Sequence, residues 1–124
     1  MVRKTLSGAA LLLVLASAAQ AQTWNIDGAH SAAQFAVRHM MVSTVRGDMG
    51  TVTGTVHFDS KNLSAATVDA TVDATGINTR EPKRDAHLKS ADFFDVVTYP
   101  TITFKSKRVM PNADGSFKVV GDLT

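Results

Sequence analysis

Cysteine is absent from the 124-residue sequence, and neither charge sign is in clear excess. The lack of cysteine excludes disulfide bonds, thiolate nucleophiles and sulfur-ligated metal sites. Without Arg3 and Lys4, which begin an apolar leader, eleven basic residues face eleven acidic ones. A chain with so little net charge has no electrostatic basis for binding nucleic acid. The composition therefore indicates one globular domain without nucleic acid as a partner.

The first 21 residues have the pattern of a secretory signal peptide. A basic start precedes an apolar run at residues 6–16, and residues 19–21 have the A-x-A form of a cleavage signal. The apolar run is shorter than the roughly 20 residues that a membrane-spanning helix needs. We therefore expect residues 1–21 to be removed and residues 22–124 to form the mature domain. Because the leader has bacterial features, we expect a periplasmic location.

Hydrophobic and polar residues alternate through most of the mature chain. In the clearest stretch, Val68, Ala70 and Val72 alternate with threonine and aspartate. The same pattern recurs in the segments 34–39, 52–58, 101–105 and 118–124. Period-two alternation with many valines and threonines predicts strands that keep one face in water. Since short turn signals join these runs, the sequence predicts an all-β antiparallel meander.

One segment interrupts the strand pattern. Residues 81–90 are mostly polar and include Pro82, which is favoured in the first turn of a helix. A short helix is therefore predicted there, across one end of the sheet. Earlier in the chain, Gly47, Gly50 and Gly54 favour a long strand that bends, as strands do in sheets that curl into barrels. An ordinary loop at this point is the alternative interpretation.

The sequence stays strand-like up to Thr124. About six strands are visible, whereas a closed barrel that holds a ligand usually has about eight or more. We therefore expect that C-terminal strands are missing and that the barrel is left open, with an unpaired edge and exposed apolar residues. An edge of this kind is open to pairing with a second copy in a homodimer.

A set of motifs in a fixed order runs through the mature chain. The most specific is RDAHLKSADFFD at residues 84–95. The others are the segments 27–31, 35–41, 45–47, 58–59 and 120–124, together with Gly54, Tyr99-Pro100 and Phe104. In this order the motifs resemble the YceI-like family. The resemblance implies an exported, lipocalin-like antiparallel β-barrel that binds polyisoprenoid chains in its interior without catalysis.

The ligand implied by the resemblance is an isoprenoid lipid of the polyprenyl phosphate or isoprenoid quinone class, and no cofactor is expected. Burial of one five-carbon isoprene unit contributes about 4 kcal/mol before the cost of immobilising the chain. The candidate ligand-binding residues are apolar positions of the strands, aromatic residues able to close one end, and one strand arginine. They are Phe35, Val37, Arg38, Val56, Phe58, Val72, Phe93, Phe94, Tyr99, Ile102 and Phe104.

Basic residues near the predicted helix are further candidates for a phosphate headgroup, or else form a solvated face. They are Arg80, Lys83, Arg84 and Lys89. The histidines lack the spacing of known metal sites, so no metal is predicted. They are His30, His39, His57 and His87, and strand alternation places His57 on the wet face with Thr53 and Thr55.

Two other functions stay open at this point. Asp85 and His87 could perform general acid–base chemistry in a hydrolase, although the same residues suit helix capping and no G-x-S-x-G motif accompanies them. Alternatively, the apolar strand faces could meet one another in the solid core of a structural or inhibitory protein.

The signal-peptide assignment predicts the N-terminus of the exported protein. N-terminal sequencing of protein recovered after export should begin at Gln22, because cleavage follows the small-residue signal at residues 19–21. An exported protein that still begins at Met1 would contradict the assignment.

Overall fold

The computed structural model describes residues 21–124, so the predicted signal peptide lies outside the described residues except for Ala21. This part of the chain contains seven strands, one α-helix and two short 3-10 helices. The strands are β1 (Gln22–Asn25), β2 (Gln34–His39), β3 (Ser43–Asp48), β4 (Val52–Phe58), β5 (Thr67–Asp73), β6 (Thr101–Pro111) and β7 (Phe117–Leu123). The helices are η1 (Leu63–Ala65), η2 (Ala74–Gly76) and α1 (Pro82–Lys89).

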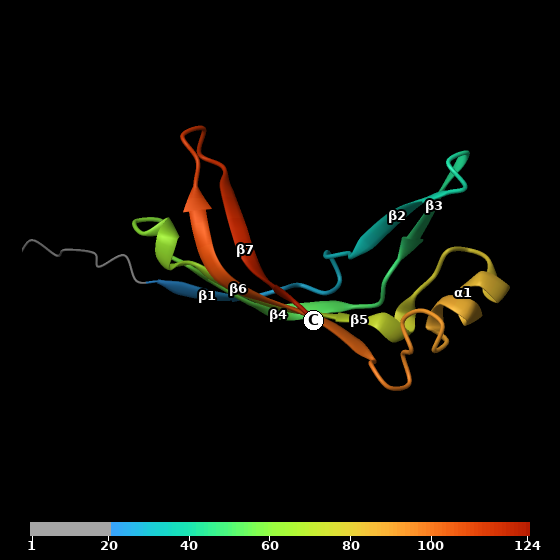
Figure 1. Ribbon diagram of the computed structural model, residues 1–124. Coiled ribbons are helices and arrows are strands. Elements are labelled where there is room, and N and C mark those ends of the chain that lie inside the picture. Colours follow the sequence, from blue (N-terminus) through green and yellow to red (C-terminus); the bar gives the residue numbers. More distant parts are fainter. Residues whose placement is uncertain (1–20) are drawn as a thin grey trace, which may run out of the picture.

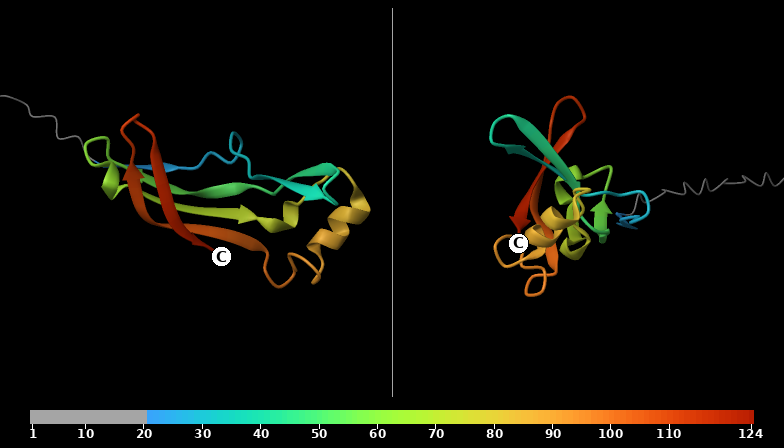
Figure 2. Two further views of the ribbon diagram at one scale, coloured as in Figure 1. Left: turned by 45° about the horizontal axis from the view of Figure 1, so that its top comes forward. Right: turned by 90° about the vertical axis from the view of Figure 1, so that its right-hand side faces the viewer.

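Five of these strands form one antiparallel sheet in the order β1-β4-β5-β6-β7. β2 and β3 form a separate antiparallel pair, which we call the β2–β3 ribbon. The ribbon and the β6–β7 hairpin rise from the same side of the sheet and leave it open between them (Figures 1 and 2). The predicted all-β fold, antiparallel, with one short helix and without barrel closure, is therefore confirmed for the described chain.

The strand register separates apolar from polar side chains. Residues directly opposite each other in antiparallel strands share a face of the sheet. Three cross-strand rows are apolar: Trp24 with Val56 and Val68; Val52 with Val72 and Ile102; and Gly54 with Ala70, Phe104 and Leu123. The alternate rows are polar, as in Thr53 with Thr71 and Thr103, or Thr55 with Asp69, Lys105 and Asp122. The predicted alternation is confirmed, and we call the first side the apolar face.

The chain bends between β3 and β4, at residues 49–51. Hydrogen bonding continues through the bend, because the Met49 amide donates to the Ala33 carbonyl and the Gly50 amide donates to the Asp73 carbonyl, both at 2.8 Å. A Cβ atom at Gly50 would lie only 2.6 Å from the Asp73 carbonyl oxygen, so glycine is required there. The bend carries β3 away from the sheet into the ribbon, in agreement with the bent-strand interpretation.

Helix α1 occupies almost the whole segment in which a helix was predicted. Pro82 stands in its first turn, where its missing amide hydrogen leaves no donor unpaired. The Glu81 side chain caps the helix by accepting a hydrogen bond from the Arg84 amide. The helix lies at the end of the sheet from which the ribbon rises (Figure 1). No helix in the described part of the chain is long and apolar enough to cross a membrane.

Few side chains are buried between residues 21 and 124. The buried apolar side chains there are Ala74, Ile77 and Val109. On the apolar face, by contrast, Trp24 is 57% exposed and Leu123 is 74% exposed. This part of the chain therefore leaves the apolar face without a covering layer, and it does not form the solid core of the alternative interpretation.

The close approach of β4 to β5 at Gly54 predicts how a substitution there changes the stability of the fold. Gly54 has a φ of 142°, and a Cβ atom there would overlap the Asp69 carbonyl oxygen and lie 2.8 Å from the Ala70 Cα. Gly54→Ala should therefore lower the free energy of unfolding by about 3 kcal/mol, because the backbone must shift to accept the methyl group. Urea unfolding measures this loss.

Gly115→Ala is the matched control for that variant. Gly115 also has a positive φ, of 84°, but nothing lies within 4 Å of an added Cβ. The control should lose only about 1 kcal/mol, from backbone strain alone. Equal losses in the two variants would contradict the importance of the close approach between the strands.

Candidate ligand-binding site

The sheet brings five of the predicted ligand-binding residues together on the apolar face. They are Val56, Phe58, Val72, Ile102 and Phe104. The ring of Phe104 extends over Gly121, where an added Cβ would lie 2.7 Å from the ring. Glycine at this position therefore gives the ring room on the face. The result is an apolar surface that continues across all five strands of the sheet.

Trp24 and Leu123 enlarge this surface, and the predicted ligand-binding residues did not include them. Trp24 lies opposite Val56, and Leu123 lies opposite Phe104. β1 has only four residues, so its alternation is too short to identify a face from sequence. Pairing with β4 places Trp24 on the apolar face, and the sequence does not reveal this pairing.

Phe35 and Val37 lie on the β2–β3 ribbon and not on the five-stranded sheet. Phe35 pairs with Gly47 and Val37 pairs with Val45, so these positions share one side of the ribbon. A Cβ at Gly47 would overlap the Phe35 ring and lie 2.9 Å from the Thr79 methyl group. Gly47 therefore lets the ring and Thr79 pack closely where the ribbon meets the segment before α1.

Arg38 lies on the opposite side of the ribbon from Phe35 and Val37. Its guanidinium donates to the Thr44 hydroxyl at 3.3 Å and to the Met41 carbonyl at 3.2 Å. These contacts hold the guanidinium beside the turn that joins β2 to β3. The structure therefore does not group Arg38 with the residues of the apolar face, and contact with a ligand headgroup stays a prediction.

The three aromatic residues proposed to close one end follow α1. The Phe93 ring meets His87 edge-on, with ring centroids 4.9 Å apart, and Phe93 itself is 58% exposed. The Phe94 amide donates to the Leu88 carbonyl at 3.0 Å, while the Tyr99 side chain is 66% exposed. These residues belong to the connection between α1 and β6, and a role in closing the site stays a prediction.

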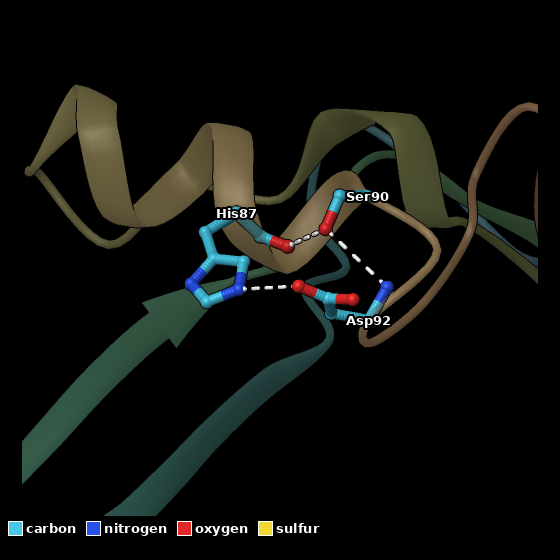
Figure 3. Close-up of polar contacts among 3 residues, drawn as sticks. All are labelled: His87, Ser90 and Asp92. Atoms are coloured by element: carbon cyan, nitrogen blue, oxygen red, sulfur yellow. Dashed lines mark hydrogen bonds and ion pairs between the residues drawn. The ribbon is translucent and has the colours of Figure 1, made fainter.

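His87 pairs with Asp92 and not with Asp85. Its Nε2 atom lies 2.9 Å from an Asp92 carboxylate oxygen, and both side chains are exposed. The Ser90 hydroxyl donates to the His87 backbone carbonyl at 2.6 Å and accepts from the Asp92 amide at 3.4 Å (Figure 3). The imidazole does not contact this hydroxyl, so the nucleophile–base hydrogen bond of a catalytic triad is not formed. The three residues instead close the C-terminal end of α1.

Asp85 anchors α1 to a buried threonine. Its carboxylate accepts hydrogen bonds from the Thr79 hydroxyl at 2.6 Å and from the Thr79 amide at 2.7 Å. Arg84 donates from Nε to the Thr79 hydroxyl at 2.7 Å and from Nη2 to the Thr79 carbonyl at 3.0 Å. The Thr79 hydroxyl is the main cause that lowers the pKa of Asp85, and the positive charges of Arg84 and Lys89 add to it. Asp85 is therefore committed to a structural contact.

A groove of about 630 Å³ is lined by residues of the β2–β3 ribbon and of the segment that leads into α1. Its walls carry three arginines, Arg46 from β3 and Arg80 and Arg84 from the start of the helical region, together with Asp48. The Arg80 backbone has a φ of 66°, held by a hydrogen bond from its amide to the Asn78 side chain at 2.8 Å. Sequence reasoning identified Arg80 and Arg84 but missed Arg46, which only the fold brings beside them.

The histidines of the described chain have separate surroundings. Nδ1 of His30 lies 2.6 Å from Asp27, and Nδ1 of His57 lies 2.8 Å from the Thr23 hydroxyl on the polar face of the sheet. No group of three or more side chains able to hold a metal ion occurs among residues 21–124.

The antiparallel sheet with one short helix and an apolar face places the chain in the class of lipocalin-type β-barrel folds. A family model described as the YceI-like domain matches residues 24–124. The chain therefore belongs to the YceI-like family.

Relatives and solved structures agree with this assignment. The chain is 38% identical to a UPF0312 protein of Vibrio parahaemolyticus over 120 residues, which cover 95% of this chain and 64% of that protein. It is 42% identical to a UPF0312 protein of Staphylococcus aureus over 101 residues, which cover 82% and 56%.

Crystal structures of related proteins show the same fold. The crystal structure of Burkholderia cenocepacia BcnA matches with a TM-score of 0.73 and 26% identity, covering 80% of this chain and 62% of that one. The Campylobacter jejuni YCEI protein matches with a TM-score of 0.60 and 32% identity, covering 80% and 58%. The chain thus spans less than two thirds of the length of these relatives.

The Thr79–Asp85 contact predicts a particular dependence of stability on pH. Because folding lowers the pKa of Asp85, its contribution to stability is full above 3.8, the ordinary pKa of the group. The contribution is lost as the pH falls through the lowered value. Thr79→Val keeps the shape of the side chain but removes the hydroxyl, so the variant should lose less stability on acidification than the wild type.

Thr79→Ser is the control for this comparison, since it keeps the hydroxyl that donates to Asp85. Urea unfolding from neutral pH down through 3.8 measures the acid-dependent loss in all three proteins. Equal acid-dependent losses in the wild type and Thr79→Val would contradict the assigned role of the hydroxyl.

Proposed function

We propose that this domain is exported to the periplasm and binds a long-chain isoprenoid lipid there without catalysing a reaction on it. One observation carries the proposal: the apolar face runs unbroken across five strands, and the described chain leaves it without a covering layer. Membership of the YceI-like family supports binding over catalysis. The signal-peptide pattern at residues 1–21 supports export.

An isoprenoid chain fits the physical properties of this face. Trp24, Phe58 and Leu123 are 57%, 36% and 74% exposed, so each has apolar surface left to cover. One isoprene unit buried against such side chains contributes about 4 kcal/mol gross. A few units therefore outweigh the cost of immobilising a flexible chain. Because the apolar face extends across all five strands of the sheet, it favours a long ligand over a compact one.

The arginine-lined groove supports a ligand with a polar headgroup. Arg46 and Arg80 are among the residues that line the groove, together with Phe35 and Val45. Guanidinium groups bind phosphate oxygens through paired hydrogen bonds, and they also donate to the carbonyl oxygens of a quinone. Both ligand classes, polyprenyl phosphate and isoprenoid quinone, are therefore included in the proposal.

We also propose that the domain can form a homodimer through an edge of the sheet. Within the described residues, β1 pairs only with β4 and β7 pairs only with β6. An edge strand presents unpaired amide and carbonyl groups, which a second copy can pair with in a homodimer.

Lipid extraction and mass spectrometry of the purified protein test the proposed function. The wild type should release an isoprenoid lipid. Ala70 lies between Gly54 and Phe104 on the apolar face, so Ala70→Asp should place a charge where the alkyl chain would lie and reduce the lipid recovered by about tenfold. The matched control is Thr71→Asp, which adds the same charge to the polar face of the same strand and should leave the lipid content unchanged.

Three results would count against the proposal. Wild-type protein without any isoprenoid lipid would remove its basis, as would an unchanged lipid content in Ala70→Asp. Turnover of a small amphipathic substrate that disappears in His87→Ala would favour a hydrolase instead.

A further inference from the structure

Three consecutive apolar residues form the tip of the β2–β3 ribbon. Met40, Met41 and Val42 are 80%, 87% and 86% exposed. The tip projects away from the five-stranded sheet (Figure 1). Contiguous exposed apolar side chains of this kind mark places where a protein meets another apolar surface.

The backbone of the tip adopts a conformation that its residues disfavour. Met40 and Met41 have φ angles of 49° and 60°, and the Val42 amide donates to the His39 carbonyl at 3.1 Å to close the turn. Turns with two positive φ angles favour Asn-Gly, because larger L-residues are strained there. Methionine therefore occupies both positions against the local preference, which points to a role for the side chains themselves.

Positive charge lies directly behind the tip. The Arg38 guanidinium donates to the Met41 carbonyl, so it sits beside the turn. No acidic residue occurs in the sequence between Asp27 and Asp48. An apolar tip with a cation behind it matches a membrane surface that contains anionic phospholipids. The apolar side chains enter the acyl boundary while the Arg38 guanidinium stays at the level of the headgroups.

We propose that the ribbon tip docks the protein on anionic phospholipid membranes. A protein partner fits the tip less well, because a stable protein interface buries about 800 Å² on each side and three side chains on a narrow turn do not supply that area. Methionine side chains are flexible and adapt to the irregular packing of acyl chains. The docking surface is separate from the apolar face, so the inference goes beyond the proposed lipid-binding function and does not depend on it.

Vesicle flotation tests the inference with the purified protein. Wild-type protein should float with vesicles of phosphatidylcholine and phosphatidylglycerol, and high salt should weaken the binding by screening Arg38. The double variant Met40→Asn/Met41→Gly installs the residues that the turn prefers, so it should fold with a raised Tm. Its vesicle binding should fall by about tenfold or more, because the apolar side chains are gone.

Val97→Asn is the matched control, since Val97 is 91% exposed in the connection between α1 and β6 and does not belong to the tip. This control should float like the wild type. The proposal is overturned if wild-type protein does not float with the vesicles, which is the result expected of a tip that binds a protein and not a membrane. It is equally overturned if the double variant floats undiminished or if Val97→Asn loses the same amount. Vesicle flotation does not require a bound isoprenoid lipid. The test is therefore still valid if the protein does not bind isoprenoids on its apolar face.

Discussion

Strand register is the constraint on which the rest of the structure depends. Side chains alternate along a strand, so a shift of β5 by one residue would send Val68, Ala70 and Val72 to the polar side of the sheet. The close approach of β4 to β5 opposes such a shift, because a glycine is needed where Gly54 faces Ala70. The apolar face is therefore a property of the pairing as a whole, and each strand contributes to it only while the register holds.

The bend at residues 49–51 gives the same chain a second surface with different chemistry. β4 belongs to the sheet, whereas β3, only three residues earlier, belongs to the ribbon. Asp48 and Asn78 fix the base of the ribbon, since the amide of each donates to the carbonyl of the other at 2.9 Å. The hydrogen bonds between Thr79 and Asp85 then hold α1 against that base. A sheet with one apolar face and a polar groove can thus occur together in a small domain that has few buried side chains.

Local patterns in the sequence were sufficient to predict the elements and much of the apolar face. Period-two alternation placed Val56, Val72 and Ile102 together, and Pro82 located the helix. Contacts between distant segments were not predictable: the ribbon removes Phe35 from the sheet, and Thr79, which resembles a loop residue, becomes buried. Asp85 and His87 were grouped because they are close in sequence, yet residues two apart on a helix do not face each other. The positive φ angles of Met40 and Met41 have no signal in the residue types, which favour other conformations.

Trp24 offers the most direct measurement of whether the apolar face holds a lipid. It is the single tryptophan of the sequence, it lies opposite Val56 on that face, and it is 57% exposed. Titration with a polyprenyl phosphate or an isoprenoid quinone should change its fluorescence saturably, since the alkyl chain displaces water from the indole ring. A quinone can quench the emission of a nearby tryptophan, whereas a polyprenyl phosphate does not. With the polyprenyl phosphate, the emission maximum should therefore move to shorter wavelength. Emission that stays the same at every concentration of both lipids would contradict the account.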